Sequence, residues 1–185
     1  MALTHTLLAL LIKHPQSGYD ISKSFDEELS CYWKATQQQV YRELSKMETQ
    51  GLVIYEMQPQ QGKPDKKIYQ ITEKGLAELM HWYAEPTKRT RIREDLLVKV
   101  LIGHQMPMDL LRNEINHRKK VHQEQLDKYL AIEAEHFEIE DPSPEVQFKY
   151  LTLKRGIAYE RSWSAWCDEV LAFLETDTSC TIQQK

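Results

Sequence analysis

Apolar residues recur every three or four positions in the first part of the chain, which predicts short amphipathic α-helices. The first such segment runs from Leu3 to Ile12. It ends before Pro15, because the residue that precedes a proline is disfavoured in a helix. A second segment begins after Gly18 and carries Tyr19 and Ile21 among its apolar residues. The chain is therefore expected to open with two helices.

A third helix is expected over about residues 37–50, within the stretch KATQQQVYRELSKMETQGLV. Thr36, followed three residues later by Gln39, is a capping-box pattern in which each side chain bonds the other residue's backbone N–H group. Gly51 is a natural terminator, because glycine readily adopts the left-handed conformation that ends many helices. The apolar stripe of this helix is formed by Val40, Leu44 and Met47.

After Gly51 the apolar period changes from that of a helix to that of a strand. LVIYEM and KKIYQI are rich in β-branched and aromatic residues, and the turn-forming stretch QPQQGKPD separates them, which predicts a β-hairpin. A fourth helix follows, with Thr72 as its cap. Three helices followed by a two-stranded hairpin is the element order of a winged helix-turn-helix, which we assign to residues 1–86.

The rest of the chain is almost entirely of helical pattern. Helices are expected over about residues 91–104, 107–137 and 144–175, with a break at DPSP between the last two. We assign residues 87–178 to an antiparallel helical dimerisation domain and residues 179–185 to a frayed tail. The expected fold class is therefore mainly α.

Composition places the chain among soluble globular proteins, with 41% hydrophobic and 28% charged residues. No apolar run is long enough to span a bilayer and no signal peptide is evident, so we expect a cytoplasmic protein. Residues 1–86 hold 9 Lys and Arg residues against 11 Asp and Glu residues. A DNA-binding domain of this balance would have to concentrate its few cations on one face.

The polar face of the third helix contains the residue types that read DNA. Glutamine and arginine make paired hydrogen bonds to the edges of adenine and guanine in the major groove, and a tyrosine hydroxyl suits a phosphate oxygen. The alternative is an ordinary solvated surface. The candidate reading residues are Gln37, Gln38, Tyr41, Arg42, Ser45 and Lys46.

The hairpin loop adds a group of cations. Lys63, Lys66 and Lys67 lie within five residues of one another, partly offset by Asp65. A lysine-rich loop is usually a solvated turn, but after a helix-turn-helix it is typical of a wing that contacts the DNA backbone or minor groove. We expect the wing to span about residues 58–67.

Three stretches resemble the PadR-like transcriptional regulators, in the branch with a long helical C-terminal domain, the vibrio virulence-gene activator type. They are SGYDI, CYWKATQQQVYRELSKMETQGLV and QPQQGKPDKKIYQIT. The resemblance implies a homodimer that reads DNA with the third helix and the wing, with Tyr19 near the DNA backbone. Such a dimer is expected to bind two half-sites of double-stranded DNA in an approximately palindromic operator. Ser17 stands where many relatives have histidine, and the glutamines of the third helix depart from the wider family, so DNA specificity is not carried over.

The last helix carries a seam of apolar residues with spacings of 4, 3, 4 and 3, as in a coiled coil. A second apolar stripe runs beside it, so the helix has more apolar surface than one neighbour can cover. We therefore assign the seam to the dimer interface, and the alternative is a pocket for a small aromatic effector. The seam consists of Tyr159, Trp163, Trp166, Val170 and Phe173.

Two pairs of residues in the C-terminal half have a spacing that also occurs in metalloenzymes. Glu114 with His117 and Glu133 with His136 have the Glu-x-x-His spacing of di-iron helical bundles. The two pairs lie 19 residues apart on one predicted helix, or about 28 Å, and cannot share a site within a chain. We expect a charged surface, no metal, no cofactor and no enzymatic activity. The alternative to a DNA-binding regulator is a winged-helix adaptor that binds proteins without DNA specificity.

Overall fold

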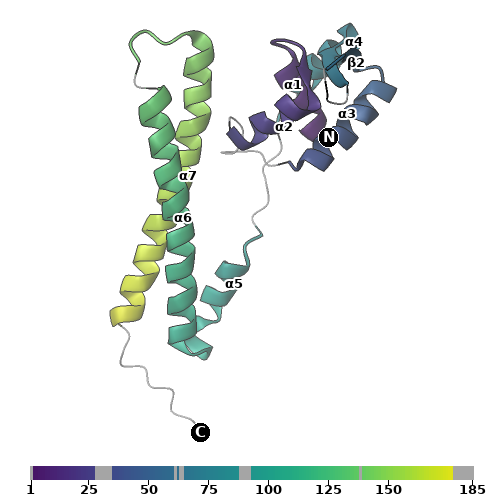
Figure 1. Ribbon diagram of the computed structural model, residues 1–185. Helices are drawn as coiled ribbons and strands as arrows, with labels where there is room; N and C mark the ends of the chain where they lie inside the picture. The colour runs from purple at the N-terminus through teal and green to yellow at the C-terminus, as the bar shows by residue number, and fades with distance from the viewer. Residues whose placement is uncertain are drawn as a thin grey trace. The chain divides into compact units, whose positions relative to one another are not determined.

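The computed structural model describes residues 2–27, 35–60, 62, 65–87, 93–137 and 139–176 (Figure 1). The chain divides into two compact units, residues 1–89 and residues 90–185. None of the described helices is long and apolar enough to cross a membrane.

Unit 1 combines four helices with a small antiparallel sheet. The helices are α1 (Ala2–Leu11), α2 (Gly18–Glu27), α3 (Gln37–Thr49) and α4 (Glu73–Ala84). The strands are β1 (Gln16–Ser17), β2 (Val53–Gln58) and β3 (Lys66–Ile71), in the order β1-β3-β2. The expected hairpin of β2 and β3 is present, and β1 adds a third strand that at two residues is too short to show an alternating pattern.

The core of unit 1 forms where α1, α2, α3 and the sheet meet. The stripe predicted for α3 is its buried face, since Val40, Leu44 and Met47 are all 0% exposed. These side chains pack with Leu7 and Phe25, among others, in one apolar cluster. The winged helix-turn-helix fold expected from the sequence is confirmed, and it fixes which side of α3 is left to solvent.

Both ends of α3 are closed by local hydrogen bonds. At the start, the backbone N–H of Gln39 bonds Thr36 Oγ1, and the backbone N–H of Thr36 bonds the side-chain oxygen of Gln39 at 2.8 Å. At the end, Gly51 has a φ of +71°, and the N–H groups of Gly51 and Leu52 bond the carbonyls of Glu48 and Met47. That pair of bonds is a Schellman motif. The predicted capping box and terminator are confirmed.

Unit 2 is a long helical hairpin with a short helix at one end. Helices α6 (Met108–His136) and α7 (Pro144–Thr176) run antiparallel, side by side (Figure 1). The helix expected over residues 91–104 is shorter, because α5 covers Asp95–Leu101 and a 3₁₀ turn covers Gly103–Gln105. Glu94 caps α5 through the backbone N–H of Leu96.

Two kinds of side chain are buried in unit 2. An apolar cluster at the α5 end contains Leu96, Leu111, Ile115, Cys167 and Leu174. A polar pair lies nearer the middle of the hairpin, where His122 Nδ1 of α6 bonds the carboxylate of Glu160 on α7, with both residues buried. Cys167 is a free, buried cysteine within the apolar cluster.

Candidate nucleic-acid interface

The solvent face of α3 presents polar side chains opposite its buried stripe. Gln37, Gln38, Arg42 and Ser45 are all exposed. Gln39 is different from its two neighbours, because its side chain is held by the cap. Arg42 makes no hydrogen bond or ion pair with the residues that the structure describes. The first turns of α3 therefore offer two glutamine amides and one guanidinium for outside contacts.

Tyr41 lies at the edge of this face with its ring against the start of α2. The residue is 42% exposed. A Cβ atom at Gly18 would lie 2.6 Å from Cε1 of the ring, so any other residue at position 18 would displace the Tyr41 ring. Glycine at position 18 thus lets the Tyr41 ring rest on the backbone of α2, and the ring is packed on one side rather than fully exposed.

Ser17 and Asp20 form a capping box at the start of α2. The Ser17 hydroxyl donates to Asp20 Oδ2 at 2.7 Å and accepts from the Asp20 backbone N–H at 3.1 Å, and the Ser17 N–H bonds the same carboxylate. Ser17 is buried, so its role at this position is to hold the helix end. Tyr19, the next candidate along the chain, is exposed.

The described lysines among the candidates each lie near an acidic side chain. Lys66 Nζ lies 2.9 Å from Asp20 Oδ2, and Lys46 Nζ lies 2.9 Å from Glu43 Oε1. Lys67 Nζ lies 3.6 Å from a Glu48 oxygen, 3.7 Å above the centre of the Tyr55 ring. The acids that offset the two wing lysines are thus Asp20 and Glu48, where the sequence had suggested Asp65. Lys63 lies outside the described residues.

These contacts shift the pKa values of two charged groups. Partial burial raises the pKa of Asp20, but hydrogen bonds from Ser17 and Lys66 outweigh it and leave the pKa below its ordinary value. Partial burial lowers the pKa of Lys67, and the hydrogen bond with Tyr55 and the nearby charge of Glu48 raise it above its ordinary value. Both groups therefore stay ionised at neutral pH.

A groove joins the start of α2, the middle of α3 and the wing. It brings together four of the predicted residues, Tyr19, Tyr41, Lys66 and Lys67. Tyrosine hydroxyls and lysine ammonium groups are donors for phosphate oxygens. The groove can therefore hold a negatively charged backbone, while the exposed glutamines and Arg42 can hydrogen-bond to base edges beside it.

The seam predicted on α7 is divided between the interior of unit 2 and its surface. Trp163, Trp166 and Val170 pack against the apolar cluster of their own chain. Tyr159 and Phe173 remain exposed. Side chains of α6 contact the Trp163 ring. The His122 ring stacks on it with ring centres 4.9 Å apart, and the Arg118 guanidinium carbon lies 5.5 Å from its centre. This packing favours the structural reading of the tryptophans over an aromatic effector pocket.

Exposed apolar side chains also gather on α5 and the segment after it, which the sequence analysis did not single out. The sequence did carry a signal, because DLLVKVL holds five apolar residues spread around more of the helix than one buried side, and only Leu96 of them is buried. Leu101 is 75% exposed. The exposed apolar residues at this end of unit 2 are Leu97, Val98, Leu101, Ile102, Met106, Leu110 and Phe173.

The two Glu-x-x-His pairs have other partners. Glu114 lies 3.2 Å from Lys99 Nζ, and Glu133 accepts a hydrogen bond from the Tyr150 hydroxyl at 2.7 Å. His136 is exposed beside Glu135. The described part of the chain contains no group of three His, Cys, Asp or Glu residues that could hold a metal ion.

Both units of the chain match known protein families. The PadR-like family of transcriptional regulators matches residues 7–81, and the C-terminal region of the virulence activator alpha family matches residues 92–175. A probable transcriptional regulator of Mycobacterium tuberculosis is 35% identical, covering 95% of this chain and 98% of its own length.

Two solved structures are similar along nearly the whole chain. The Vibrio cholerae virulence activator AphA has a TM-score of 0.83 at 30% identity, covering 95% of this chain and 99% of its own. Bacillus subtilis PadR in complex with operator DNA has a TM-score of 0.80 at 26% identity, covering 94% of this chain and 99% of its own.

Proposed function

Because this chain belongs to the PadR-like family of transcriptional regulators, we propose that it binds specific DNA sites as a homodimer. In each subunit α3 lies in the major groove, and the wing of β2 and β3 lies on the DNA backbone or in the minor groove. The proposed contact residues are those expected from the sequence: Tyr19, Gln37, Gln38, Tyr41, Arg42, Ser45, Lys46, Lys63, Lys66 and Lys67.

The observation that carries this proposal is the division of α3 into a buried and a reading side. Val40, Leu44 and Met47 are fully buried, whereas Gln37 and Gln38 in the first turn are exposed. The side chain of Gln39, by contrast, is held by the cap. The relative with operator DNA supports the same use of this fold. Tyr41 and Lys66 lie beside the reading side, in the groove, and are the proposed backbone contacts.

The proposed dimer forms through unit 2. Monomeric proteins seldom expose so many large apolar side chains at one end, and such surfaces mark interfaces. Leu97, Leu101 and Leu110 supply the apolar surface there, and Tyr159 and Phe173 are the members of the α7 seam that remain available. Two linked copies raise the effective concentration at the second half-site to about millimolar, which can multiply affinity about a hundredfold.

The alternatives are less well supported. An adaptor without DNA specificity gives no reason for an exposed Arg42 and paired glutamines at the start of α3. The glutamates of the two Glu-x-x-His pairs, Glu114 and Glu133, are engaged in an ion pair and a hydrogen bond, and we propose no catalytic activity. In bacteria such as those of the relatives, a DNA-bound regulator works in the cytoplasm, which is the location expected from the sequence.

Two measurements test this function. Selection of bound duplexes from a random pool by the full chain should enrich one approximately palindromic motif, with half-sites about one helical turn apart. No enrichment would favour the adaptor. Sedimentation of the full chain should give a dimer. Leu101→Glu should give a monomer, because it places a charge in the apolar interface. Val121→Glu is the control: it changes an exposed apolar residue on α6 and should stay dimeric.

A further inference from the structure

A hollow in unit 1 lies between the end of α1 and the first two turns of α2. Its volume is about 240 Å³, which exceeds the roughly 150 Å³ that is enough to hold benzene, so a phosphate group fits inside it. Three basic residues line it, Lys13, His14 and Lys23, together with one acidic residue, Asp20. The three basic side chains are exposed, and none of them is among the proposed DNA contacts. It is called the α1–α2 hollow below.

The other polar side chains in the walls of the α1–α2 hollow are bonded within unit 1. Gln16 Nε2 donates to the Leu10 carbonyl at 2.9 Å, and the Ser24 hydroxyl donates to the Asp20 carbonyl at 3.2 Å. The Asp20 carboxylate accepts a hydrogen bond from Lys66 at 2.9 Å, so its charge is balanced by the wing. The exposed basic side chains are therefore the donors that a ligand in the hollow would meet.

Unit 1 has few cations, and two of them come together here. Residues 1–86 hold 9 Lys and Arg residues, and five of these are proposed DNA contacts. Lys34 lies outside the described residues, and Lys74 on α4 donates to the Gln50 carbonyl at 2.8 Å. The other two are Lys13 and Lys23, which line the same hollow. An acidic domain that binds DNA has to place its cations where phosphates lie, so this grouping favours a phosphate site.

The end of a helix also attracts cations, and this alternative explains only part of the group. Lys13 and His14 follow the last residue of α1, where the helix dipole favours positive charge. Lys23 lies in the middle of α2, away from either helix end, and lines the same hollow. The dipole of α1 therefore does not account for the third basic side chain.

The position of Lys23 on α2 relates the hollow to the proposed DNA contacts. Lys23 and Tyr19 are four residues apart, which places them on one face of the helix, about 6 Å apart along its axis. Tyr19 lines the groove at the start of α2, and Asp20 lines the hollow while its carboxylate holds Lys66 of the groove. The groove and the hollow therefore adjoin along α2. In a helix-turn-helix the first helix crosses the DNA backbone, and here that helix is α2.

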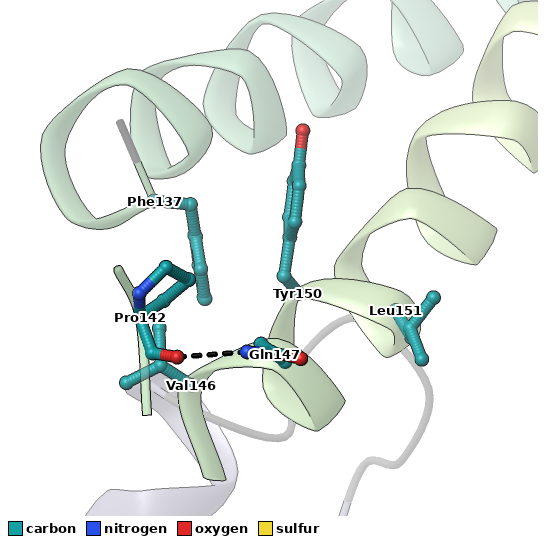
Figure 2. A pocket seen from close by; sticks show the side chains of 6 residues that line it. All are labelled: Phe137, Pro142, Val146, Gln147, Tyr150 and Leu151. Carbon is teal, nitrogen blue, oxygen red and sulfur yellow. Dashed lines mark hydrogen bonds between the residues drawn. The ribbon is translucent and has the colours of Figure 1, made fainter. Parts of the chain in front are cut away.

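The depression at the turn end of the α6–α7 hairpin shows what a hollow of a different kind looks like. Figure 2 shows the rings of Phe137 and Tyr150 facing each other in its wall, with their centres 5.1 Å apart. The Gln147 amide donates to the Pro142 carbonyl at 2.8 Å, and the Tyr150 hydroxyl donates to Glu133. The residues that line this depression include no charged side chain. The α1–α2 hollow, with three basic residues, is the better match for an anion.

We propose that the α1–α2 hollow binds a phosphate of the DNA backbone through Lys13, His14 and Lys23. The inference rests on the proposed function, because it extends the same protein–DNA contact along α2. Backbone contacts fix the position of a protein on the duplex but carry no sequence information directly. The three residues therefore raise the affinity for all duplexes and hold α2 on the backbone while α3 enters the major groove.

Lys23→Gln tests this contact in titrations of the full chain with the selected duplex and with a shuffled duplex of the same composition. Loss of one phosphate contact should weaken binding to both duplexes about fivefold at physiological salt, and lower the slope of log affinity against log salt by about 0.9. Adding Lys13→Gln should lower the slope further, whereas Lys23→Arg keeps the charge and should restore it. Lys74→Gln is the matched control, because it removes the same charge from an exposed lysine on α4.

Neutral methylphosphonates, placed at one phosphate at a time in the duplex, locate the contact on the DNA. At one position in each half-site the substitution should weaken binding by the parent chain and leave Lys23→Gln unaffected, because that variant has already lost the contact. The proposal is wrong if Lys23→Gln binds like the parent chain, if Lys74→Gln is as damaging, or if every methylphosphonate weakens the parent and Lys23→Gln equally.

Two further measurements separate DNA from other occupants of the hollow. Inorganic phosphate should displace the duplex no more than chloride does at the same ionic strength, and stronger displacement that Lys23→Gln abolishes would mean a site for free phosphate. Sedimentation of the variant with both Lys13→Gln and Lys23→Gln should still give a dimer. Loss of the dimer would overturn the proposal, because the hollow would then hold acidic side chains of a second copy.

The same titrations distinguish this proposal from the proposed function. If the parent chain binds both duplexes equally and Lys23→Gln weakens both, the phosphate contact stands and the sequence-specific function is wrong. If the parent chain prefers the selected duplex and Lys23→Gln retains full affinity, the function stands and the contact is wrong. A parent chain that binds neither duplex would overturn both.

Discussion

Lys66 Nζ lies 2.9 Å from Asp20 Oδ2, so a carboxylate at the start of α2 holds a cation of the wing. DNA phosphate must compete with this carboxylate for Lys66. Replacing Asp20 by asparagine should therefore raise the affinity for all duplexes, and steepen the salt dependence by up to about one unit of slope. An asparagine oxygen can still accept the Ser17 N–H bond and keep the cap.

Asp65→Asn is the matched control for Asp20→Asn, because it removes an acid from the same groove. It should have the smaller effect in a binding titration over a range of salt concentrations. If both variants raise affinity equally, the ion pair has no special role. Weaker binding by Asp20→Asn would mean that the pair positions the wing rather than withholding its charge.

The stability of unit 1 should fall in mild acid. Partial burial raises the pKa values of Asp20 and Glu43, but hydrogen bonds from Ser17 and Lys66 to the first, and from Thr4 and Lys46 to the second, leave both below their ordinary values of 3.8 and 4.5. A carboxylate with a lowered folded-state pKa contributes stability above its unfolded pKa, and this contribution is lost as pH falls through the folded value. The loss should begin near pH 4.5 and continue below pH 3.8.

Hydrogen exchange of the α3 amides measures this effect in unit 1 alone, because it reports local opening. The opening free energy should fall between pH 6 and pH 3.5, and Asp20→Asn with Glu43→Gln should reduce that fall. Glu56→Gln, at an exposed position on β2, is the control and should behave like the parent chain. An unchanged pH dependence in the double variant would contradict the assignment.

Arg42 should read a base rather than a phosphate. Arg42→Ala should cost about 1–3 kcal/mol and relax the preference at one base pair, if the guanidinium bonds a guanine. Arg42→Lys keeps the charge but lacks the planar pair of donors, so it should restore little of the preference. The measurement is a titration against the selected duplex and its single-base variants. Full recovery by lysine would reassign Arg42 to the backbone, and an unaffected Arg42→Ala would remove it from the contacts.

Gly18→Ala should impair DNA binding more than stability. The new Cβ would lie 2.6 Å from the Tyr41 ring, which can move at little cost because it is half exposed, but its hydroxyl would then leave the groove. Loss of one hydrogen bond to a charged oxygen corresponds to about 1.5–3 kcal/mol. Tyr41→Phe should lose a similar amount, whereas Ser22→Ala on the same helix should bind like the parent chain. A Gly18→Ala variant with full affinity would exclude Tyr41 as a contact.

The sequence predicts the features of α3 that depend on near neighbours. The Thr36–Gln39 cap, the terminator at Gly51 and the buried stripe all follow from residues within one or two turns, and the structure contains each of them. It does not predict strand β1, which consists of two residues and exists only because β3 lies beside it. Short-range patterns carry no information about such a partner.

The electrostatics of the site depend on contacts between distant parts of the chain. Asp20 and Lys66 are 46 residues apart, and only the folded sheet brings them together. The His122–Glu160 pair could have been suspected, because His122 lies seven residues after Ile115 and four before Leu126, both buried on α6. A polar residue at such a core position requires a partner, and Glu160 on α7 supplies it.

The central claim is that this chain recognises a DNA sequence, and one affinity ratio tests it most directly. The full chain is titrated, at one physiological salt concentration, with the duplex found by selection and with a shuffled duplex of the same composition. Sequence-specific regulators bind their sites about a thousandfold or more tightly than other DNA. We predict a ratio of at least that order. A ratio near one would contradict the account, because the α3 face would then be a surface without a reading role.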